Sequence, residues 1–201
     1  MGVGDLKTRR AVFLDRDGVL NRNIFNPATG AFESPHDPRD LIVVPGAAAA
    51  LHRLRDANFL LCVVSNQPDY ALGKASLEAL AAIRSRLEAT LGADGITFDA
   101  VYYCYHHPRG ITPGYAGPCQ CRKPSPYFLL TARDALGIDL ARSWMVGDRV
   151  TDIECGRAAG VKTIRVAADH PTTRAADEMA ADFDVEDLSA AVATILQQES
   201  V

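Results

Sequence analysis

The sequence predicts an α/β fold, a Rossmann-like three-layer sandwich built on a parallel sheet. Short apolar runs alternate with amphipathic segments along the chain. Strand, helix and strand at this spacing indicate crossover units, which produce a parallel sheet covered on both faces. The 201 residues contain no repeat and no low-complexity linker, and that length is typical of one domain. We therefore expect a single domain over residues 1–201, with its core at about 11–185.

Each element is expected where its periodicity occurs in the sequence. Short apolar runs predict the strands, at Ala11–Leu14, Leu60–Val64, Ala100–Tyr103, Trp144–Val146 and Thr163–Val166. Apolar residues at helical spacing predict the helices, at Ala47–Asp56, Leu77–Leu91, Pro126–Leu136, Thr151–Ala159 and Asp187–Gln198. In the second of these helices the charges lie opposite the leucines, so we expect one solvated face and one core stripe.

Two irregular segments interrupt this pattern. Asn21–Arg39 is rich in Asn, Pro and Gly, and Cys104–Pro124 is rich in Cys, His, Pro and Gly. Long irregular loops in compact domains tend to be functional. In the first segment, His36, Asp37 and Arg39 could reach over a pocket, although a solvated surface loop is an equally good interpretation.

Composition narrows the classes of function. Hydrophobic residues make up 48% and charged residues 23%, with a net charge of −4 and no basic block, which argues against a nucleic-acid partner. No apolar stretch reaches membrane-spanning length, because Pro45 and Gly46 interrupt the richest candidate. The first residues lack the apolar core of a signal peptide. We expect a cytoplasmic monomer whose five cysteines serve as thiols or metal ligands.

Two carboxylates follow the first apolar run. Asp15 and Asp17 are spaced i, i+2 and precede Gly18. Ligands of open α/β sheets bind at the carboxyl ends of the strands, so both acids are expected at the functional edge. Both are ionised at neutral pH by their reference pKa and repel each other. A hard divalent cation such as Mg²⁺ would relieve that repulsion.

Polar groups also follow later strands or precede a helix. These patches are Ser65-Asn66-Gln67, Arg122-Lys123-Pro124 and Gly147-Asp148-Arg149-x-x-Asp152. Any one of them alone is a common turn or surface motif. Their joint occurrence predicts one convergent site.

The convergent groups suit phosphoryl transfer. A carboxylate can attack phosphorus and form an aspartyl phosphate. A second carboxylate can serve the leaving oxygen and then the incoming water. A hydroxyl and a lysine can hold the equatorial oxygens, and a third acid can complete a metal site.

The cysteine-rich segment predicts a zinc site. Cys104 and His106 are followed, after twelve residues, by Cys119 and Cys121. Three sulfurs and one nitrogen close a tetrahedral shell, which indicates a structural rather than catalytic zinc. His107 is an alternative ligand, and a redox-active Cys-x-Cys pair is the alternative interpretation.

The remaining cysteines, Cys62 and Cys155, are expected as buried small hydrophobes in a strand and a helix.

These motifs resemble those of the haloacid dehalogenase (HAD) superfamily of phosphatases, over about Ala11–Val166. The resemblance implies that Asp15 is the nucleophile and Asp17 the general acid and base. Ser65 matches the Ser/Thr motif and Lys123 the lysine of the family, both as catalytic groups.

The same resemblance implies the magnesium ligands. Mg²⁺ would be bound by Asp15, Asp148 and the main-chain carbonyl of Asp17, with Asp152 as a supporting acid. Asn66, Gln67, Arg122 and Arg149 are expected to contact the substrate.

The zinc loop is similar to that of the zinc-containing branch of heptose bisphosphate and histidinol-phosphate phosphatases. The matching stretches are DRDGVLN at Asp15–Asn21, SNQ at Ser65–Gln67, CYHHPRG at Cys104–Gly110, CQCRKPSP at Cys119–Pro126 and GDRVTDI at Asp148–Ile153. The twelve-residue spacer resembles the heptose enzymes, whereas Arg149–Asp152 is closer to the histidinol pattern. The length leaves no room for a separate cap domain.

This resemblance implies a magnesium-dependent phosphatase that acts on the C7 phosphate of D-glycero-D-manno-heptose 1,7-bisphosphate through an aspartyl phosphate. The product would feed lipopolysaccharide, capsule or another glycan. Histidinol phosphate or another small sugar phosphate is the alternative substrate.

One stretch departs from the family pattern. The heptose enzymes usually have Ser-Gly-Ile-Ala-Arg-Gly after Asn-Gln, where this chain has Pro68-Asp69-Tyr70-Ala71-Leu72-Gly73. The family's arginine helps to hold the non-transferred phosphate, and Leu72 cannot replace a guanidinium. The cations that could take over are Lys74, Arg122, Arg149 and Arg22. A substrate with a single phosphate is the other interpretation.

Two further classes of function are weighed against the phosphatase. A phosphotransferase such as a mutase needs a way to exclude water, and the lack of cap sequence argues against it. A zinc-stabilised binding module would not need the five polar groups Asp15, Asp17, Ser65, Lys123 and Asp148.

Overall fold

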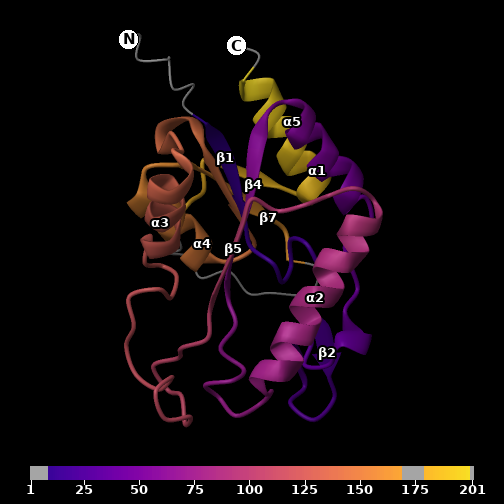
Figure 1. Cartoon of the computed structure of the whole chain (residues 1–201), viewed down its shortest axis with the longest axis vertical. Helices are drawn as coiled ribbons and strands as arrows, with labels where there is room; N and C mark the ends of the chain where they lie inside the picture. The colour runs from indigo at the N-terminus through magenta and orange to yellow at the C-terminus, as the bar shows by residue number, and fades with distance from the viewer. Residues whose placement is uncertain (1–8, 169–178, 200–201) are drawn as a thin grey trace, which may run out of the picture.

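A computed structural model of the chain describes residues 9–168 and 179–199 (Figure 1). Its main sheet has six parallel strands in the order β5-β4-β1-β6-β7-β8. Their bounds are β1 Arg10–Leu14, β4 Phe59–Asn66, β5 Ala100–Cys104, β6 Trp144–Gly147, β7 Lys162–Val166 and β8 Phe183–Val185. A separate antiparallel hairpin consists of β2 Ile24–Asn26 and β3 Ala31–Glu33.

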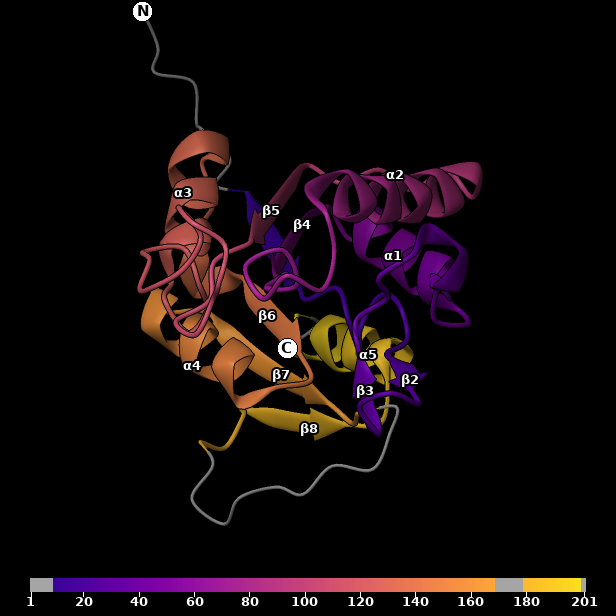
Figure 2. The same cartoon turned by 90° about the horizontal axis from the view of Figure 1, so that it is seen from below.

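Helices cover both faces of the main sheet (Figure 2). On one side lie α1 Ala47–Asp56, α2 Leu77–Ala93 and α5 Leu188–Gln198, and on the other lie α3 Tyr127–Leu136 and α4 Val150–Ala159. Two single 3₁₀ turns occur at Pro38–Asp40 and Leu140–Arg142. The predicted three-layer α/β sandwich is therefore confirmed.

Strand β1 shows how the layers are held together. Val12 and Leu14 pack in the apolar cluster that includes α1, α2 and α5, whereas Ala11 and Phe13 pack in the cluster that includes α3 and α4. This is the two-residue alternation of a strand. All four side chains are fully buried, and each of the larger ones contributes about 1.5–3 kcal/mol. The strand that leads into Asp15 is thus fixed from both faces.

The predicted strands and helices are all present, with ends that differ by at most two residues. The predicted core stripe of α2 is also confirmed, because Leu80, Ile83, Leu87 and Leu91 are buried. No helix in the described residues is both long enough and apolar enough to cross a membrane.

The prediction of an irregular segment over 21–39 is wrong in part, because the hairpin β2–β3 lies within it. Each of its strands has only three residues, too few to show alternation. Phe25 and Phe32 pair across the hairpin with ring centroids 5.4 Å apart. The turn closes as the amides of Thr29 and Gly30 donate to the carbonyl of Asn26.

Strand β8 was also not predicted. It has three residues at the edge of the sheet. Just before it, the Asp182 carboxylate accepts hydrogen bonds from the amide and hydroxyl of Thr163, at 2.7 and 2.8 Å. A tertiary anchor of this kind leaves no periodic signal in the sequence.

Close packing fixes α4 against the sheet. A Cβ added to Gly156 would lie 2.7 Å from Thr163 Cγ2 and 2.8 Å from Met145 Cβ. The glycine therefore lets the helix backbone approach β6 and β7, and the first turn of α4 carries Asp152 to the carboxyl edge of the sheet.

Candidate active site

Asp15 and Asp17 lie where the chain leaves β1. The amide of Asp15 donates to the carbonyl of Val146 at 2.9 Å, which ties this turn to β6. Gly18 has φ +84°, and a Cβ there would lie 2.4 Å from Asp148 Oδ2. Only glycine suits this position, because the chain turns in a left-handed conformation directly beside Asp148.

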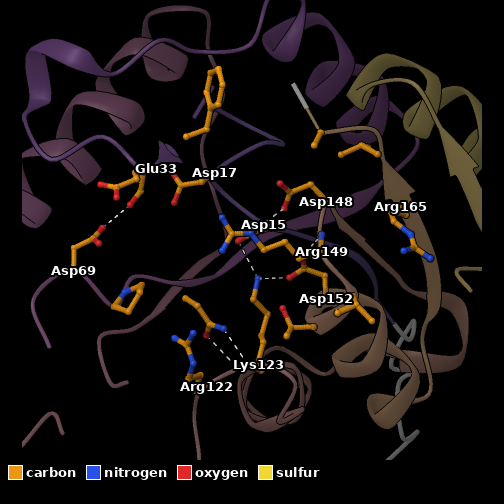
Figure 3. A pocket seen from close by; sticks show the side chains of 18 of the residues that line it. Asp15, Asp17, Glu33, Asp69, Arg122, Lys123, Asp148, Arg149, Asp152 and Arg165 are labelled. Atoms are coloured by element: carbon orange, nitrogen blue, oxygen red, sulfur yellow. Dashed lines mark hydrogen bonds and ion pairs between the residues drawn. The ribbon is translucent and has the colours of Figure 1, made fainter. Parts of the chain in front are cut away.

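Lys123 bridges two acids at the floor of the site (Figure 3). Its Nζ lies 2.9 Å from Asp15 Oδ1 and 2.5 Å from Asp152 Oδ1, and it also donates to the carbonyl of Val64 at 2.7 Å. Burial disfavours the ammonium, but the two carboxylates outweigh burial and raise the pKa of Lys123.

The same ion pair controls Asp15. Burial acts to raise the pKa of this carboxyl, but the charge and hydrogen bond of Lys123 prevail and lower it, with help from a hydrogen bond to Ser65. Asp15 is therefore an ionised carboxylate at neutral pH, which is the form that can act as a nucleophile.

Asp148 is the acid whose ionisation would give the site an excess of negative charge. The carboxylate oxygens of Asp15, Asp148 and Asp152 lie within 4.8 Å of one another. Burial, followed by the charges of Asp15 and Asp152, raises the pKa of Asp148 to about 8. Its buried Oδ1 has no hydrogen-bond partner among the described residues. This oxygen-rich, charge-excess cluster fits a hard divalent cation such as Mg²⁺.

Asp152 has a positioning role. Its Oδ2 accepts a hydrogen bond from the amide of Arg149 at 3.0 Å, in the capping box that begins α4. A Cβ on Gly147 would lie 2.3 Å from Asp152 Cβ. The absence of a side chain at Gly147 therefore leaves room for the Asp152 side chain. Asp152 is therefore held by α4 on one side and by Lys123 on the other.

Asp17 points to a different set of partners. The buried guanidinium of Arg16 donates to both carboxylate oxygens, with Nη2 at 2.8 Å from Oδ1 and 3.0 Å from Oδ2. Asn21 Nδ2 donates to Oδ1 at 2.9 Å, and Gln67 Nε2 donates to Oδ2 at 2.6 Å. The carboxylate of Asp17 is thus held in a fully polar, buried environment.

Sequence reasoning did not identify Arg16 and Asn21 as partners of Asp17. Both lie inside the DRDGVLN stretch, but their side-chain directions depend on the turn at Gly18, which the sequence pattern does not specify.

The site opens into a cavity of about 570 Å³. Among the residues expected to contact substrate, Asn66, Arg122 and Arg149 line it, whereas Gln67 does not. Gln67 is fully buried between Asp17 and Ser65, so it supports those two side chains from behind.

Asn66 also holds Lys123 through the main chain. Its Oδ1 accepts from the Lys123 amide at 3.0 Å and its Nδ2 donates to the Lys123 carbonyl at 3.1 Å. This paired contact joins the end of β4 to the segment that follows the cysteine cluster.

The structure brings Cys104, His106, Cys119 and Cys121 together. The Sγ–Sγ distances are 3.1–3.7 Å, and His106 Nδ1 lies 3.6 Å from Cys121 Sγ and 3.9 Å from Cys104 Sγ. Ligands at about 2.3 and 2.0 Å from a tetrahedral Zn²⁺ would be separated by similar distances. The four side chains therefore fit one zinc ion.

His107 is not part of this cluster, because its Nδ1 accepts a hydrogen bond from the amide of Arg109 at 3.1 Å. Cys62 and Cys155 are fully buried, in β4 and α4, as predicted.

His36, Asp37 and Arg39 were expected to reach over the pocket, but none of these three residues lines the cavity. Asp37 and Arg39 pair with each other at the surface, with Arg39 Nη2 at 2.8 Å from Asp37 Oδ2. His36 instead lies 3.5 Å from Asp69 Oδ1. Lys74 does line the cavity.

Comparison with known proteins identifies the family to which the chain belongs. A HAD-hydrolase-like family model matches residues 120–191. The D-glycero-beta-D-manno-heptose-1,7-bisphosphate 7-phosphatase of Vibrio cholerae is 38% identical over 171 residues, covering 85% of this chain and 88% of that protein. The enzyme of the same name from Escherichia coli K12 is 34% identical over 194 residues, covering 96% and 97%.

A more identical relative is the D-glycero-D-manno-heptose-1,7-bisphosphate 7-phosphatase of Thermosynechococcus vestitus, at 41% over 162 residues and 79% of each chain. A crystal structure of D,D-heptose 1,7-bisphosphate phosphatase from B. bronchiseptica, complexed with magnesium and phosphate, has a TM-score of 0.75 and 27% identity, covering 94% of this chain and 99% of that one. The chain therefore belongs to the HAD-like phosphatases, in the family of the heptose-1,7-bisphosphate 7-phosphatases, and it is a phosphoric monoester hydrolase.

Proposed function

We propose that this phosphatase is magnesium-dependent and hydrolyses the C7 phosphate of D-glycero-D-manno-heptose 1,7-bisphosphate through an aspartyl phosphate. The observation that supports it most directly is the ionised Asp15, 2.9 Å from Lys123, at the floor of a 570 Å³ cavity. The names of its relatives supply the substrate.

In the first half-reaction, Asp15 attacks phosphorus with a carboxylate oxygen, and the bond to the sugar oxygen breaks. For this step Asp17 has first taken up a proton from solvent, which weakens its pairing with Arg16, and it donates that proton to the leaving oxygen. In the second half-reaction, Asp17 accepts a proton from water as the water attacks the aspartyl phosphate, which restores Asp15 and releases inorganic phosphate.

Lys123 and Ser65 act on the phosphoryl oxygens. The Lys123 ammonium is buried and already oriented by two carboxylates, so it stabilises negative charge without reorganisation. Ser65 is 2% exposed, and its hydroxyl, which hydrogen-bonds to Asp15, is proposed as a donor to the phosphoryl oxygens. Bound Mg²⁺, held by Asp15, Asp148 and the main-chain carbonyl of Asp17, would neutralise the carboxylates and polarise the phosphoryl group.

The second phosphate is assigned to Arg122 and Arg149. Arg149 has a side chain that is 59% exposed, and the carboxylate within reach, Asp148, lies 3.9 Å from its Nε. Arg122 donates to the carbonyl of His106 at 3.2 Å, so the zinc loop sets its position. Guanidinium groups suit phosphate because they offer two parallel donors.

Zinc is assigned a structural role. Cys121 directly precedes Arg122 and Lys123, so a closed metal shell would fix both cations beside the phosphate. We assign the enzyme to the cytoplasm as a monomer, with a product that supplies heptose for lipopolysaccharide, capsule or another glycan.

The test is phosphate release with Mg²⁺ from both anomers of the heptose bisphosphate and from histidinol phosphate. Faster release from one heptose anomer is expected, and faster release from histidinol phosphate would select the alternative substrate. Asp15→Asn is expected to lower kcat by about 10³-fold or more while the fold persists, because Asp152 still pairs with Lys123. Turnover retained in that variant would exclude Asp15 as the nucleophile.

A further inference from the structure

The β2–β3 hairpin and residues 68–74 form one wall of the cavity, and this wall is more apolar than the rest of the site. Phe32, Pro68 and Leu72 supply apolar surface there. Phe32 is 38% exposed, and Leu72 is half-buried. The catalytic floor and the opposite side are charged.

The polar groups of this wall are engaged with one another. Lys74 Nζ lies 2.8 Å from Glu33 Oε1, and this hydrogen bond lowers the pKa of Glu33 to about 2. The hydroxyl of Ser34 donates to Asp69 Oδ2, and His36 Nε2 lies 3.5 Å from Asp69 Oδ1. Lys74, the cation of this wall, is thus already neutralised by a carboxylate.

The backbone holds Leu72 in a fixed place. Its amide donates to the carbonyl of Pro68 at 2.9 Å. The neighbouring carbonyl of Ala71 accepts from the Ile111 amide at 2.7 Å, and that of Tyr70 accepts from the Thr112 hydroxyl at 2.7 Å. The zinc loop therefore supports this turn from the outside, and Leu72 is a formed part of the wall.

Figure 3 shows the resulting polarity of the cavity. Glu33 and Asp69 lie on one side of Asp15, and Arg149 lies on the other. An anionic group placed against the hairpin would meet apolar side chains, the Asp69 carboxylate and a Glu33–Lys74 ion pair with no net charge, which costs free energy. The same group placed toward Arg149 or Arg122 would meet a guanidinium.

We propose that Phe32 and Leu72 are specificity-determining residues that contact the apolar ring face of the leaving group. The inference rests on the proposed function and deepens it. The wall formed by the hairpin contacts the carbon skeleton of the leaving group, and a second phosphate binds to Arg122 and Arg149. The substrate class is thus a phosphomonoester whose leaving group carries a ring with an apolar face.

The test compares kcat/KM of Leu72→Ser and Phe32→Ser on three compounds: heptose 1,7-bisphosphate, heptose 7-phosphate and acetyl phosphate. We expect a fall of about 10-fold on both heptose compounds, because the lost apolar contact is to the ring they share. Acetyl phosphate, which has no ring, should be unaffected. Arg149→Met should instead lower kcat/KM for the bisphosphate by a larger factor than for the 7-phosphate.

Two controls accompany these variants. Leu72→Met conserves the volume and the apolar character of the side chain and should keep the wild-type kcat/KM on all three compounds. Ile42→Ser removes an exposed apolar side chain that does not line the cavity and should change nothing.

Three results for Leu72→Ser would overturn the inference. They are a fall in kcat/KM confined to the bisphosphate, an equal fall on acetyl phosphate, or no fall on any of the three compounds. If the wild-type enzyme hydrolyses no heptose phosphate, the proposed function fails separately. The same variants are then compared on histidinol phosphate, where a 10-fold loss supports the ring-face contact and its absence overturns it.

Discussion

At the residue scale, the charge of Asp17 is matched by one buried guanidinium and two amides. The guanidinium of Arg16 is itself completely buried, and its Nη1 has no hydrogen-bond partner among the described residues. Arg16 therefore depends on Asp17 as much as Asp17 depends on Arg16. This reciprocal dependence makes the pair a stability element as well as part of the site.

Asp17→Ala should consequently destabilise the fold, because it leaves a buried guanidinium without its partner. The expected loss is about 3–5 kcal/mol in the free energy of unfolding, measured by urea denaturation. The matched control is Asp134→Ala, which breaks the exposed pair with Arg133 and should change the free energy of unfolding by less than about 1 kcal/mol. Equal effects of the two substitutions would contradict the role assigned to Arg16.

The sequence could predict the convergence of Asp15, Lys123 and Asp148, because the carboxyl ends of parallel strands meet at one edge of the sheet. It could not predict that Gln67 turns away from the cavity. That outcome depends on the hydrogen bonds to Asp17 and Ser65, which exist only once three separate segments have assembled.

At the element scale, the close contact of α4 with β6 and β7 depends on Gly156. Gly156→Ala should destabilise the fold by about 1–3 kcal/mol, because the added methyl overlaps Thr163 and Met145. Gly92→Ala in α2 is the matched control, since a Cβ there meets nothing within 4 Å. It should stabilise by about 0.5–1 kcal/mol. Thermal unfolding of both variants measures the difference, and a neutral Gly156→Ala would show that α4 can shift.

The zinc loop gives a second prediction at this scale. Cys119→Ser should abolish stoichiometric zinc binding, lower the unfolding temperature and reduce kcat, because Arg122 and Lys123 follow the cluster directly. Metal analysis, thermal unfolding and phosphate release measure the three effects. Cys62→Ala, in β4 outside the cluster, should keep its zinc. Full activity and stability without zinc would exclude the structural role.

Periodicity was sufficient to locate the long elements, but not the hairpin β2–β3 or the edge strand β8. Those short strands exist because of contacts made elsewhere, such as the Phe25–Phe32 ring pair and the Thr163–Asp182 hydrogen bonds. Sequence patterns of three residues hold no usable period.

At the scale of the whole molecule, the carboxylate cluster makes stability depend on pH and on Mg²⁺. Burial and the nearby acids raise the pKa of Asp148 from 3.8 to about 8, so without metal the folded state holds a proton that the unfolded state has lost. Stability should therefore fall by a few kcal/mol between pH 4 and pH 8 in EDTA. Saturating Mg²⁺ should flatten this fall, because the ion favours ionised Asp148.

Chemical denaturation at several pH values, with EDTA or Mg²⁺, measures this dependence. In Asp148→Asn the fall between pH 4 and pH 8 should shrink and the response to Mg²⁺ should disappear. A wild-type stability that is constant or rises over this range in EDTA would contradict the charge excess assigned to the cluster.

The strand order also sets the timing of folding during synthesis. Strand β1 lies between β4 and β6, and β6 emerges from the ribosome about 130 residues after β1, roughly 7–26 s later at 5–20 residues per second. Until then the nascent chain exposes one unpaired edge of its central strand, with free backbone N–H and C=O groups. Ribosome-associated chaperones are expected to protect that edge, and any truncation before Trp144 leaves it permanently open to association with other chains.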